Sequence, residues 1–373
     1  MVYTKNINVI GAGINNTTIT GTKFAFFMGL RNKASWRISG MTLEPTGVDP
    51  AIKIDAMDYA TEATYGWRID NIAFKGASTT SIQIFGETWG VIDHCTFDQP
   101  SGLTILINAS MVNADTTFGG DYELSLPLAL GSKDAVYVED CVFSFNGTDT
   151  LPCVFDMDHG GGRIVFRYNT VNDGFLYNHW NRQHGFAGTK WEVYNNKLIG
   201  DNGAEVDGHA PMRFQAGTGV AFNNTITGYT TASIKLDELR GCGAESTDPL
   251  GACDGSKTWD GNLGNGTTEG AGWPCINQIG RATGKTLTQI TTGGEQQDSS
   301  PAYAWNNGAE NGCSEGGACT NSVDFSRYNT CTNNTLMANV HSNGEYDYIN
   351  NGSTPMPNRS EEHTSELQSR SDL

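Results

Sequence analysis

Histidine, arginine and aspartate side chains gather in three short stretches near the middle of the chain. The stretches are Asp156–Arg163, His179–His184 and Asp207–Arg213. An imidazole can take up or release a proton near neutral pH, and a guanidinium can hold a carboxylate through two parallel hydrogen bonds. Side chains of these types, held close together, could bind an anionic ligand and transfer one of its protons.

A sequence repeat must position these side chains. Seven segments alternate apolar and polar residues, turn on a polar pair and end on an apolar residue. They are Trp36–Leu43, Trp67–Phe74, Gly90–Phe97, Val136–Phe143, Ile164–Val171, Trp191–Leu198 and Gly219–Ile226. Their last residues lie 31, 23, 46, 28, 27 and 28 residues apart, and because 46 is twice 23 we expect one degenerate repeat between Phe97 and Phe143. Strand-like alternation at this period predicts an all-β solenoid, a parallel β-helix whose coils (single turns of the helix) stack on one another.

A polar residue lies two positions before the end of five of these segments. The five residues are Cys95, Cys141, Asn169, Asn196 and Asn224. Stacked asparagines can hydrogen-bond from coil to coil as an asparagine ladder, although Asn-Asn pairs are also common turn residues. With a degenerate coil between them, the two cysteines would lie about 9.6 Å apart, which is too far for a disulfide.

The candidate site residues follow the same repeat. Counted back from the apolar residue that ends each segment, His159, His184 and Arg213 lie 12, 14 and 13 residues upstream. We therefore expect these three side chains to stack on one strand face of successive coils, with Arg182 beside them and Lys235 on the next coil. Such a row predicts a groove for a linear anionic chain.

A purely structural interpretation of the same residues stays open. Exposed histidines and arginines are often only solvated, and Asp156 and Asp158 could be turn acids. Gly160–Gly162 is most simply a tight turn, and it lacks the pattern of a nucleotide-binding loop.

Composition limits the class of partner. The chain has 373 residues, of which 41 are acidic and 23 basic, so its net charge is −18. This charge disfavours non-specific binding to nucleic acid or anionic membranes, whereas clustered acids could hold Ca²⁺. The chain contains no run of eighteen apolar residues, so the sequence predicts no membrane span.

Six of the nine cysteines crowd into ninety residues, 242–331. They are Cys242, Cys253, Cys275, Cys313, Cys319 and Cys331. Weak periodicity over residues 241–300 predicts a loop-rich insertion in the β-helix, which could cover one face as a flap. Disulfides would stabilise it and would indicate an oxidising compartment. Zinc is the alternative, but no Cys-x-x-Cys pair supports it.

Three segments carry a family resemblance. Lys5–Gly13, Thr17–Gly21 and Gly219–Thr225 resemble strands and an inner turn of the pectate-lyase-like superfamily. The resemblance covers about residues 5–358 and implies a right-handed parallel β-helix. It leaves activity open, because the same architecture serves lyases, hydrolases, phage tailspikes and adhesins.

The site and the resemblance together predict an extracellular or cell-surface polysaccharide lyase acting on uronate-containing glycans. Arg182 and Arg213 would bind carboxylates, and His159 or His184 would accept the proton. Further binding residues would be His179, Trp180 and Lys235.

Three alternatives remain. A glycoside hydrolase would use Asp156 and Asp158 as acid and base, but Asp207–His209 and Ile234–Lys235 are only fragments of the polygalacturonase pattern. The other two are a non-catalytic glycan-binding adhesin and a phage tailspike-type depolymerase. The oligomeric state is not predicted.

Both ends of the chain depart from the domain pattern. Residues 359–373 resemble the in-frame translation of a sequencing adapter, as expected of a metagenomic fragment, so we place the β-helix domain in residues 1–358. Met1–Tyr3 runs almost directly into a strand, and we expect a missing N-terminal cap and signal peptide.

Overall fold

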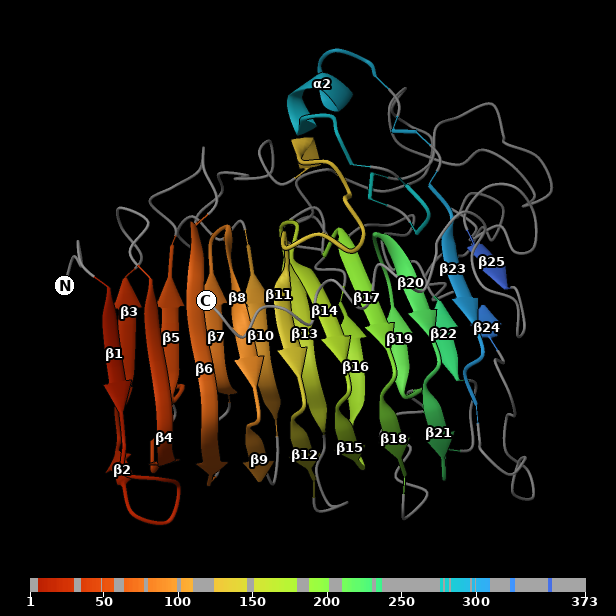
Figure 1. Cartoon of the computed structure of the whole chain (residues 1–373). Helices are drawn as coiled ribbons and strands as arrows, with labels where there is room; N and C mark the ends of the chain where they lie inside the picture. The colour runs from red at the N-terminus through yellow and green to blue at the C-terminus, as the bar shows by residue number, and fades with distance from the viewer. Residues whose placement is uncertain are drawn as a thin grey trace.

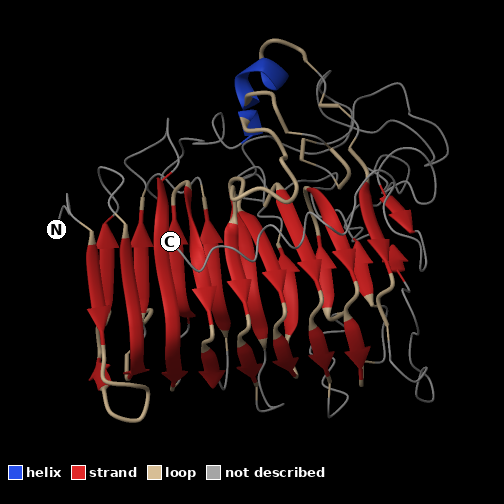
Figure 2. Ribbon diagram, viewed as in Figure 1, coloured by secondary structure: helices blue, strands red, loops and turns tan. Residues whose placement is uncertain are grey.

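The computed structural model describes residues 6–29, 35–47, 49–56, 64–76, 80–98, 102–109, 124–145, 151–179, 188–200, 210–229, 233–236, 276–277, 279–281, 283–295, 297–298, 300–308, 323–325 and 348–350. The chain is an all-β parallel β-helix built from two long sheets (Figures 1 and 2). The fold predicted from the repeat is therefore confirmed.

The larger sheet, sheet A, has 16 strands. They are β1 (Ile7–Ile10), β2 (Thr18–Gly21), β4 (Trp36–Pro45), β6 (Thr64–Lys75), β8 (Thr88–Asp93), β9 (Thr96–Asp98), β11 (Val136–Glu139), β12 (Val142–Ser144), β14 (Arg163–Arg167), β15 (Thr170–Asn172), β17 (Lys190–Tyr194), β18 (Lys197–Ile199), β20 (Thr218–Phe222), β21 (Thr225–Thr227), β23 (Ala302–Trp305) and β25 (Tyr348–Asn350).

The second sheet, sheet B, has nine strands. They are β3 (Phe26–Gly29), β5 (Ile52–Asp55), β7 (Thr80–Phe85), β10 (Leu103–Asn108), β13 (Cys153–His159), β16 (Phe175–Asn178), β19 (Met212–Phe214), β22 (Ile234–Leu236) and β24 (Val323–Phe325). A typical coil passes through a sheet A strand, a turn, a short sheet A strand and a sheet B strand, as in β14, β15 and β16.

Strand alternation separates the core from the outer faces. On β17, Trp191 and Val193 belong to the main core cluster, while Tyr194 belongs to a separate cluster outside sheet A. Identical residues stack from coil to coil inside: Phe97 lies between Phe74 and Phe143, with 4.6 Å between ring centroids on each side. Stacked rings fill the core at the strand spacing, and this explains why the repeats end on similar apolar residues.

The predicted asparagine ladder is confirmed. Asn196 Oδ1 accepts hydrogen bonds from the backbone N–H and the Nδ2 of Asn169 at 2.9 and 3.2 Å. Asn224 Oδ1 likewise accepts hydrogen bonds from the backbone N–H and the Nδ2 of Asn196 at 3.1 and 2.9 Å. Asn307 continues the ladder by accepting from Asn224 Nδ2 at 2.8 Å.

A left-handed backbone conformation explains which residue types come directly before each ladder position. The residues with positive φ at this point are Asn71, His94, Asp140, Tyr168, Asn195, Asn223 and Asn306. Asparagine, aspartate and histidine are enriched in this conformation among non-glycine residues. The Asn-Asn pairs therefore have two functions, because the first residue makes the turn and the second makes the ladder.

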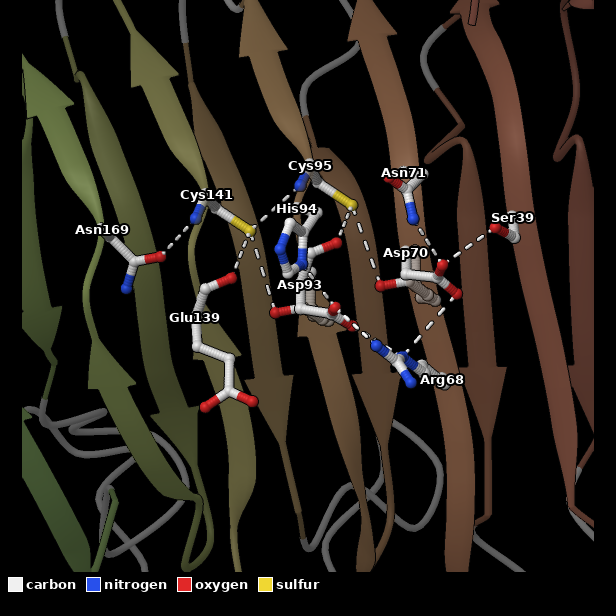
Figure 3. Close-up of polar contacts among 12 residues, drawn as sticks. Ser39, Arg68, Asp70, Asn71, Asp93, His94, Cys95, Glu139, Cys141 and Asn169 are labelled. Carbon is white, nitrogen blue, oxygen red and sulfur yellow. Dashed lines mark hydrogen bonds and ion pairs between the residues drawn. The ribbon is translucent and has the colours of Figure 1, made fainter. Parts of the chain in front are cut away.

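The prediction of a degenerate coil between Phe97 and Phe143 is wrong. Strand β9 pairs directly with β12, and Phe97 is the register partner of Phe143. The long interval instead contains the connection from β10 to β11, residues 109–135. Cys95 and Cys141 therefore lie on neighbouring coils, and the Cys95 backbone N–H donates to Cys141 Sγ at 3.4 Å (Figure 3).

A long segment separates the last two coils that carry both sheets. Strand β22 ends at Leu236, and β23 begins at Ala302 and pairs with β20. Described parts of this segment contact the start of β20, where Thr218 Oγ1 donates to the Ser300 carbonyl at 2.7 Å. The six cysteines between residues 242 and 331 lie outside the described residues, so their disulfides stay a prediction.

The described helix α2 (Leu287–Thr291) lies in this segment, above the sheets in Figure 1. Thr286 and Gln289 form a capping box at its N-terminus, which satisfies two otherwise unpaired backbone N–H groups. Leu287 and Ile290 pack with Leu124 and Ile276 in a small separate cluster. Of the helices in the described residues, none is long and apolar enough to cross a membrane.

Candidate functional site

The outer face of sheet B brings several of the predicted site residues into one column, meaning one register position on successive coils. Asp156 on β13 is the partner of Tyr177 on β16. Tyr177 pairs in turn with Arg213 on β19, and Arg213 pairs with Lys235 on β22. Neighbouring strands in a sheet lie about 4.8 Å apart, so this column offers an acid, an aromatic ring and two cations in sequence.

Side-chain contacts join this column into one cluster, which we call the sheet B cluster: Asp156, Tyr177, His179 and Arg213. His179 Nδ1 lies 3.5 Å from Asp156 Oδ2. The His179 ring stacks on Tyr177 with 4.6 Å between centroids and an interplanar angle of 11°. The guanidinium carbon of Arg213 lies 5.1 Å from the centre of the Tyr177 ring, within the range of a cation–π contact.

Burial within the cluster is uneven. Asp156, Tyr177 and Arg213 are 4%, 7% and 6% exposed, whereas the side chain of His179 is 38% exposed. Lys235 is partly exposed. Charges in a desolvated setting interact more strongly than charges in water, and the half-exposed imidazole is the most exposed of the four side chains of the cluster.

Strand β13 is irregular where it carries the acids. Its register shifts against β10 between Leu106 and Asn108, and it shifts against β16 between Cys153 and Phe155. Such bulges add a residue, change the direction of nearby side chains and are over-represented next to active sites. Gly160 and Gly161 follow with positive φ, so the glycine run forms the tight turn into β14.

The structure changes the predicted row of residues. Lys235 follows Arg213 as expected, but the register partner of His159 is Asn108, and Asp156 rather than His159 shares the column of Arg213. Similar distances from the end of each repeat did not place the residues in one column, because the connections from sheet B back to sheet A differ in length. The connection is residues 160–162 in one coil and residues 179–189 in the next. The bulges of β13 add a further offset.

Other predicted site residues cannot be placed as side chains. Asp158 and His159 lie in β13, but only their backbone is described. Trp180, Arg182 and His184 lie outside the described residues. Within the described part of the chain, no three His, Cys, Asp or Glu residues gather as a metal site, so the suggested Ca²⁺ has no described ligand set.

Sequence reasoning missed Tyr177 and the pairing of Asp156 with His179. Tyr177 lies two residues before His179, so strand alternation places both on one face. That signal was available in the sequence. The contact with Asp156 was not, because it depends on the bulges of β13.

A row of ion pairs covers the outer face of sheet A over β4, β6 and β8 (Figure 3). Arg37 donates to both carboxylate oxygens of Asp70 at 2.6 Å, and Arg68 donates to those of Asp93 at 2.9 and 2.8 Å. Burial raises the pKa of Asp70, but hydrogen bonds, first that of Arg37, lower it below its ordinary value overall. His94 Nδ1 also contacts Asp93 Oδ2 at 2.7 Å. These carboxylates are already paired, so we interpret the row as a cross-coil support.

Buried charges attach a segment of the chain to sheet A further along. Arg163 donates to the carbonyls of Leu126 and Pro127 at 3.0 and 2.7 Å. Lys190 donates to the Ala129 carbonyl at 2.8 Å, and Glu192 accepts from the Gly131 backbone N–H at 2.7 Å. We call residues 124–134 the strap. Its Leu130 packs on the apolar cluster outside sheet A.

Glu87 lies at the corner before β8, next to these charges. It is 3% exposed, and its Oε1 has no hydrogen-bond partner among the described residues. Burial raises its pKa to about 7, although the charge of Arg163 lowers it and that of Asp134 raises it. A carboxyl group in this setting is protonated in mildly acidic solution and ionised above neutrality.

We expect Glu87→Gln to remove a pH dependence from stability. The folded pKa of about 7 exceeds the unfolded value of about 4.3, so the folded state binds more protons between the two values. Wild-type stability should therefore fall by on the order of 2–3 kcal/mol as pH rises from about 4.5 to about 7, relative to Glu87→Gln. Melting temperatures of both proteins across this range test the difference, and parallel curves would contradict it.

Comparison with protein-family models, curated proteins and solved structures gave no match to this chain. A function must therefore be argued from the fold and from the sheet B cluster.

Proposed function

We propose that the protein is an extracellular, polysaccharide-active β-helix protein, and that the sheet B cluster is its site for acidic glycans. The observation that carries the proposal is the contact of one aromatic ring with both an imidazole and a guanidinium, next to a carboxylate that contacts the imidazole. Guanidinium groups pair with carboxylates, and an imidazole can accept a proton. A uronate residue presents both a carboxylate and a proton on the carbon next to it.

The reaction that fits this arrangement best is lyase chemistry. Arg213 would pair with the uronate carboxylate and withdraw charge from the adjacent carbon, which makes its proton more acidic. With Nδ1 of His179 directed at Asp156, Nε2 is the nitrogen that would take this proton. The electron pair left on carbon would form a double bond and expel the glycosidic oxygen of the neighbouring sugar, which would take up a proton from water. Asp156 would stabilise the imidazolium that results.

His179→Gln tests the catalytic part of the proposal. It should lower turnover of acidic glycans by about 100-fold or more, because a general base contributes at least that much. The readouts are the ultraviolet absorbance of the unsaturated product and the release of reducing ends. Melting temperature should change little, because His179 is partly exposed. Turnover at the wild-type rate would exclude His179 as the base.

Arg213→Gln tests the binding part. It should weaken binding of charged glycans about 10-fold or more, because a charge-assisted bidentate pair is lost, and it should leave neutral glycans unaffected. Lys197→Ala is the matched control, since Lys197 is exposed on the same coil but on β18 of sheet A. Equal losses in the two variants would indicate a general charge effect instead of a site.

A non-catalytic glycan-binding protein is the second candidate. The stack of Arg213, Tyr177 and His179 is a binding geometry that needs no bond cleavage. Binding of acidic glycans that depends on Arg213 but yields no unsaturated or reducing product would favour it. Products with new reducing ends and no double bond would favour a glycoside hydrolase or tailspike-type depolymerase.

A further inference from the structure

Cys95 and Cys141 occupy neighbouring positions inside the β-helix. Strands β9 and β12 begin one residue after them and pair in register, Thr96 with Val142. The Val142 backbone N–H donates to the Cys95 carbonyl at 2.9 Å. Parallel neighbours lie about 4.8 Å apart, and disulfides join Cα atoms about 4.4–6.8 Å apart.

The two sulfur atoms point the same way, each toward the preceding coil. Cys141 Sγ lies 3.8 Å from the Ile92 carbonyl oxygen and Cys95 Sγ lies 3.8 Å from that of Ile69, so a bond between them requires the Cys95 side chain to turn toward Cys141. Cys141 Sγ lies 3.4 Å from the backbone nitrogen of Cys95, so it points back toward the preceding coil (Figure 3). Both residues are 1% exposed, and both are free thiols in this structure. The third described cysteine, Cys153, is on β13 of sheet B.

The residue type at the ladder position changes at these two coils. Asparagines follow on the C-terminal side, while the corresponding positions on β4 and β6 are the apolar Met41 and Ile72. A thiol is a weak hydrogen-bonding group, so the two cysteines satisfy the ladder less well than asparagines would. A covalent bond between them would join the coils where the asparagine ladder is absent.

We propose that Cys95 and Cys141 form a cross-coil disulfide when the protein folds in an oxidising environment. The oxidant is a small-molecule disulfide. One thiolate attacks it and releases one thiol, and the second cysteine then loses its proton and displaces the other thiol from the mixed disulfide. Two electrons pass to the oxidant, which leaves as two thiols, and one sulfur–sulfur bond forms in the protein.

Burial controls when this bond can form. Burial and then the hydrogen bond with Cys95 raise the pKa of the Cys141 thiol, so little thiolate exists in the folded protein. The bond therefore forms during folding, before the coils close over the sulfur atoms, and afterwards resists reduction. Native reduced protein should oxidise at least 10-fold more slowly than protein refolding in the same glutathione buffer.

Mass mapping of the wild-type protein tests the proposal. The protein is refolded with mixed reduced and oxidised glutathione, quenched with acid, alkylated in denaturant and digested without reduction. A peptide pair linked through Cys95 and Cys141 is the expected result. Recovery of both residues as alkylated thiols, or of either residue linked to a different cysteine, would overturn the proposal.

Two variants separate the bond from general thiol effects. Cys141→Ser should abolish the linked peptide and leave Cys95 alkylated, whereas Cys153→Ser should preserve the link. Reduction should lower the melting temperature of the Cys153→Ser protein by on the order of 5 °C more than that of the Cys141→Ser protein, because closing a long loop stabilises a fold. A melting temperature that is equally sensitive to reduction in Cys141→Ser would contradict the assignment.

Discussion

Lys190→Met should lower the free energy of unfolding by on the order of 3–5 kcal/mol, the usual cost of removing one partner of a buried ion pair. Lys190 and Glu192 are both 0% exposed, and Lys190 Nζ lies 3.2 Å from Glu192 Oε1. Methionine fills the same space but leaves the Glu192 carboxylate buried without the Lys190 ammonium group. It also removes the donor to the Ala129 carbonyl, so the strap should detach more readily.

A second variant shows whether charge or packing is responsible. Lys190→Met/Glu192→Gln restores neutrality and keeps an acceptor for the Gly131 N–H, so it should recover about half or more of the loss. Denaturant titration measures the stabilities, and limited proteolysis at residues 124–134 measures the opening of the strap. A double variant that is no more stable than Lys190→Met would show that the lost packing of the lysine stem dominates.

The repeat architecture could be predicted from the sequence because it depends on local patterns that recur. Strand alternation selects the inward residues, such as Trp191 and Val193. The Asn-Asn pairs mark the turn, because a residue that tolerates positive φ must come directly before the ladder residue. Both signals are complete within about ten residues, so no knowledge of distant contacts was required.

The degenerate coil was predicted wrongly because residue counts do not distinguish a coil from a loop of similar length. The interval from Phe97 to Phe143 equals two short periods, yet it contains one coil and a long connection. A better signal was present in the residue types. Phe97 and Phe143 are the same residue type, and their rings stack face to face with 4.6 Å between centroids. Cys95 and Cys141, two residues before them, match in the same way.

The candidate site was predicted only in part because it depends on three-dimensional offsets. The strands of sheet B are reached across connections of variable length, and β13 contains bulges. An offset of one residue moves a side chain to the opposite face of a strand. Sequence spacing could therefore place Arg213 and Lys235 together, but not Asp156 with His179.

The ladder itself should be the most sensitive part of the core to a polar-to-apolar substitution. Asn196 Oδ1 accepts two hydrogen bonds from Asn169. Its Nδ2 donates to the carbonyls of Phe166 and Tyr194 at 2.9 and 3.1 Å and to Asn224 Oδ1 at 2.9 Å. Asn196 is only 3% exposed, so water cannot replace these partners without opening the coil.

Asn196→Leu should therefore destabilise the β-helix by on the order of 4–5 kcal/mol, because each buried group left unpaired costs about 1–3 kcal/mol and partial relaxation recovers some of the sum. The matched control is Asn195→Asp: it changes the adjacent turn residue, keeps a side chain that tolerates positive φ, and should shift stability by less than about 1 kcal/mol. Asn196→Cys introduces the residue found at positions 95 and 141 and should fall between the two, because a thiol retains a weak donor and acceptor. Thermal melting followed by circular dichroism ranks the three variants. An Asn196→Leu protein as stable as the Asn195→Asp control would mean that stacked aromatic rings and backbone pairing hold the coils together without the ladder.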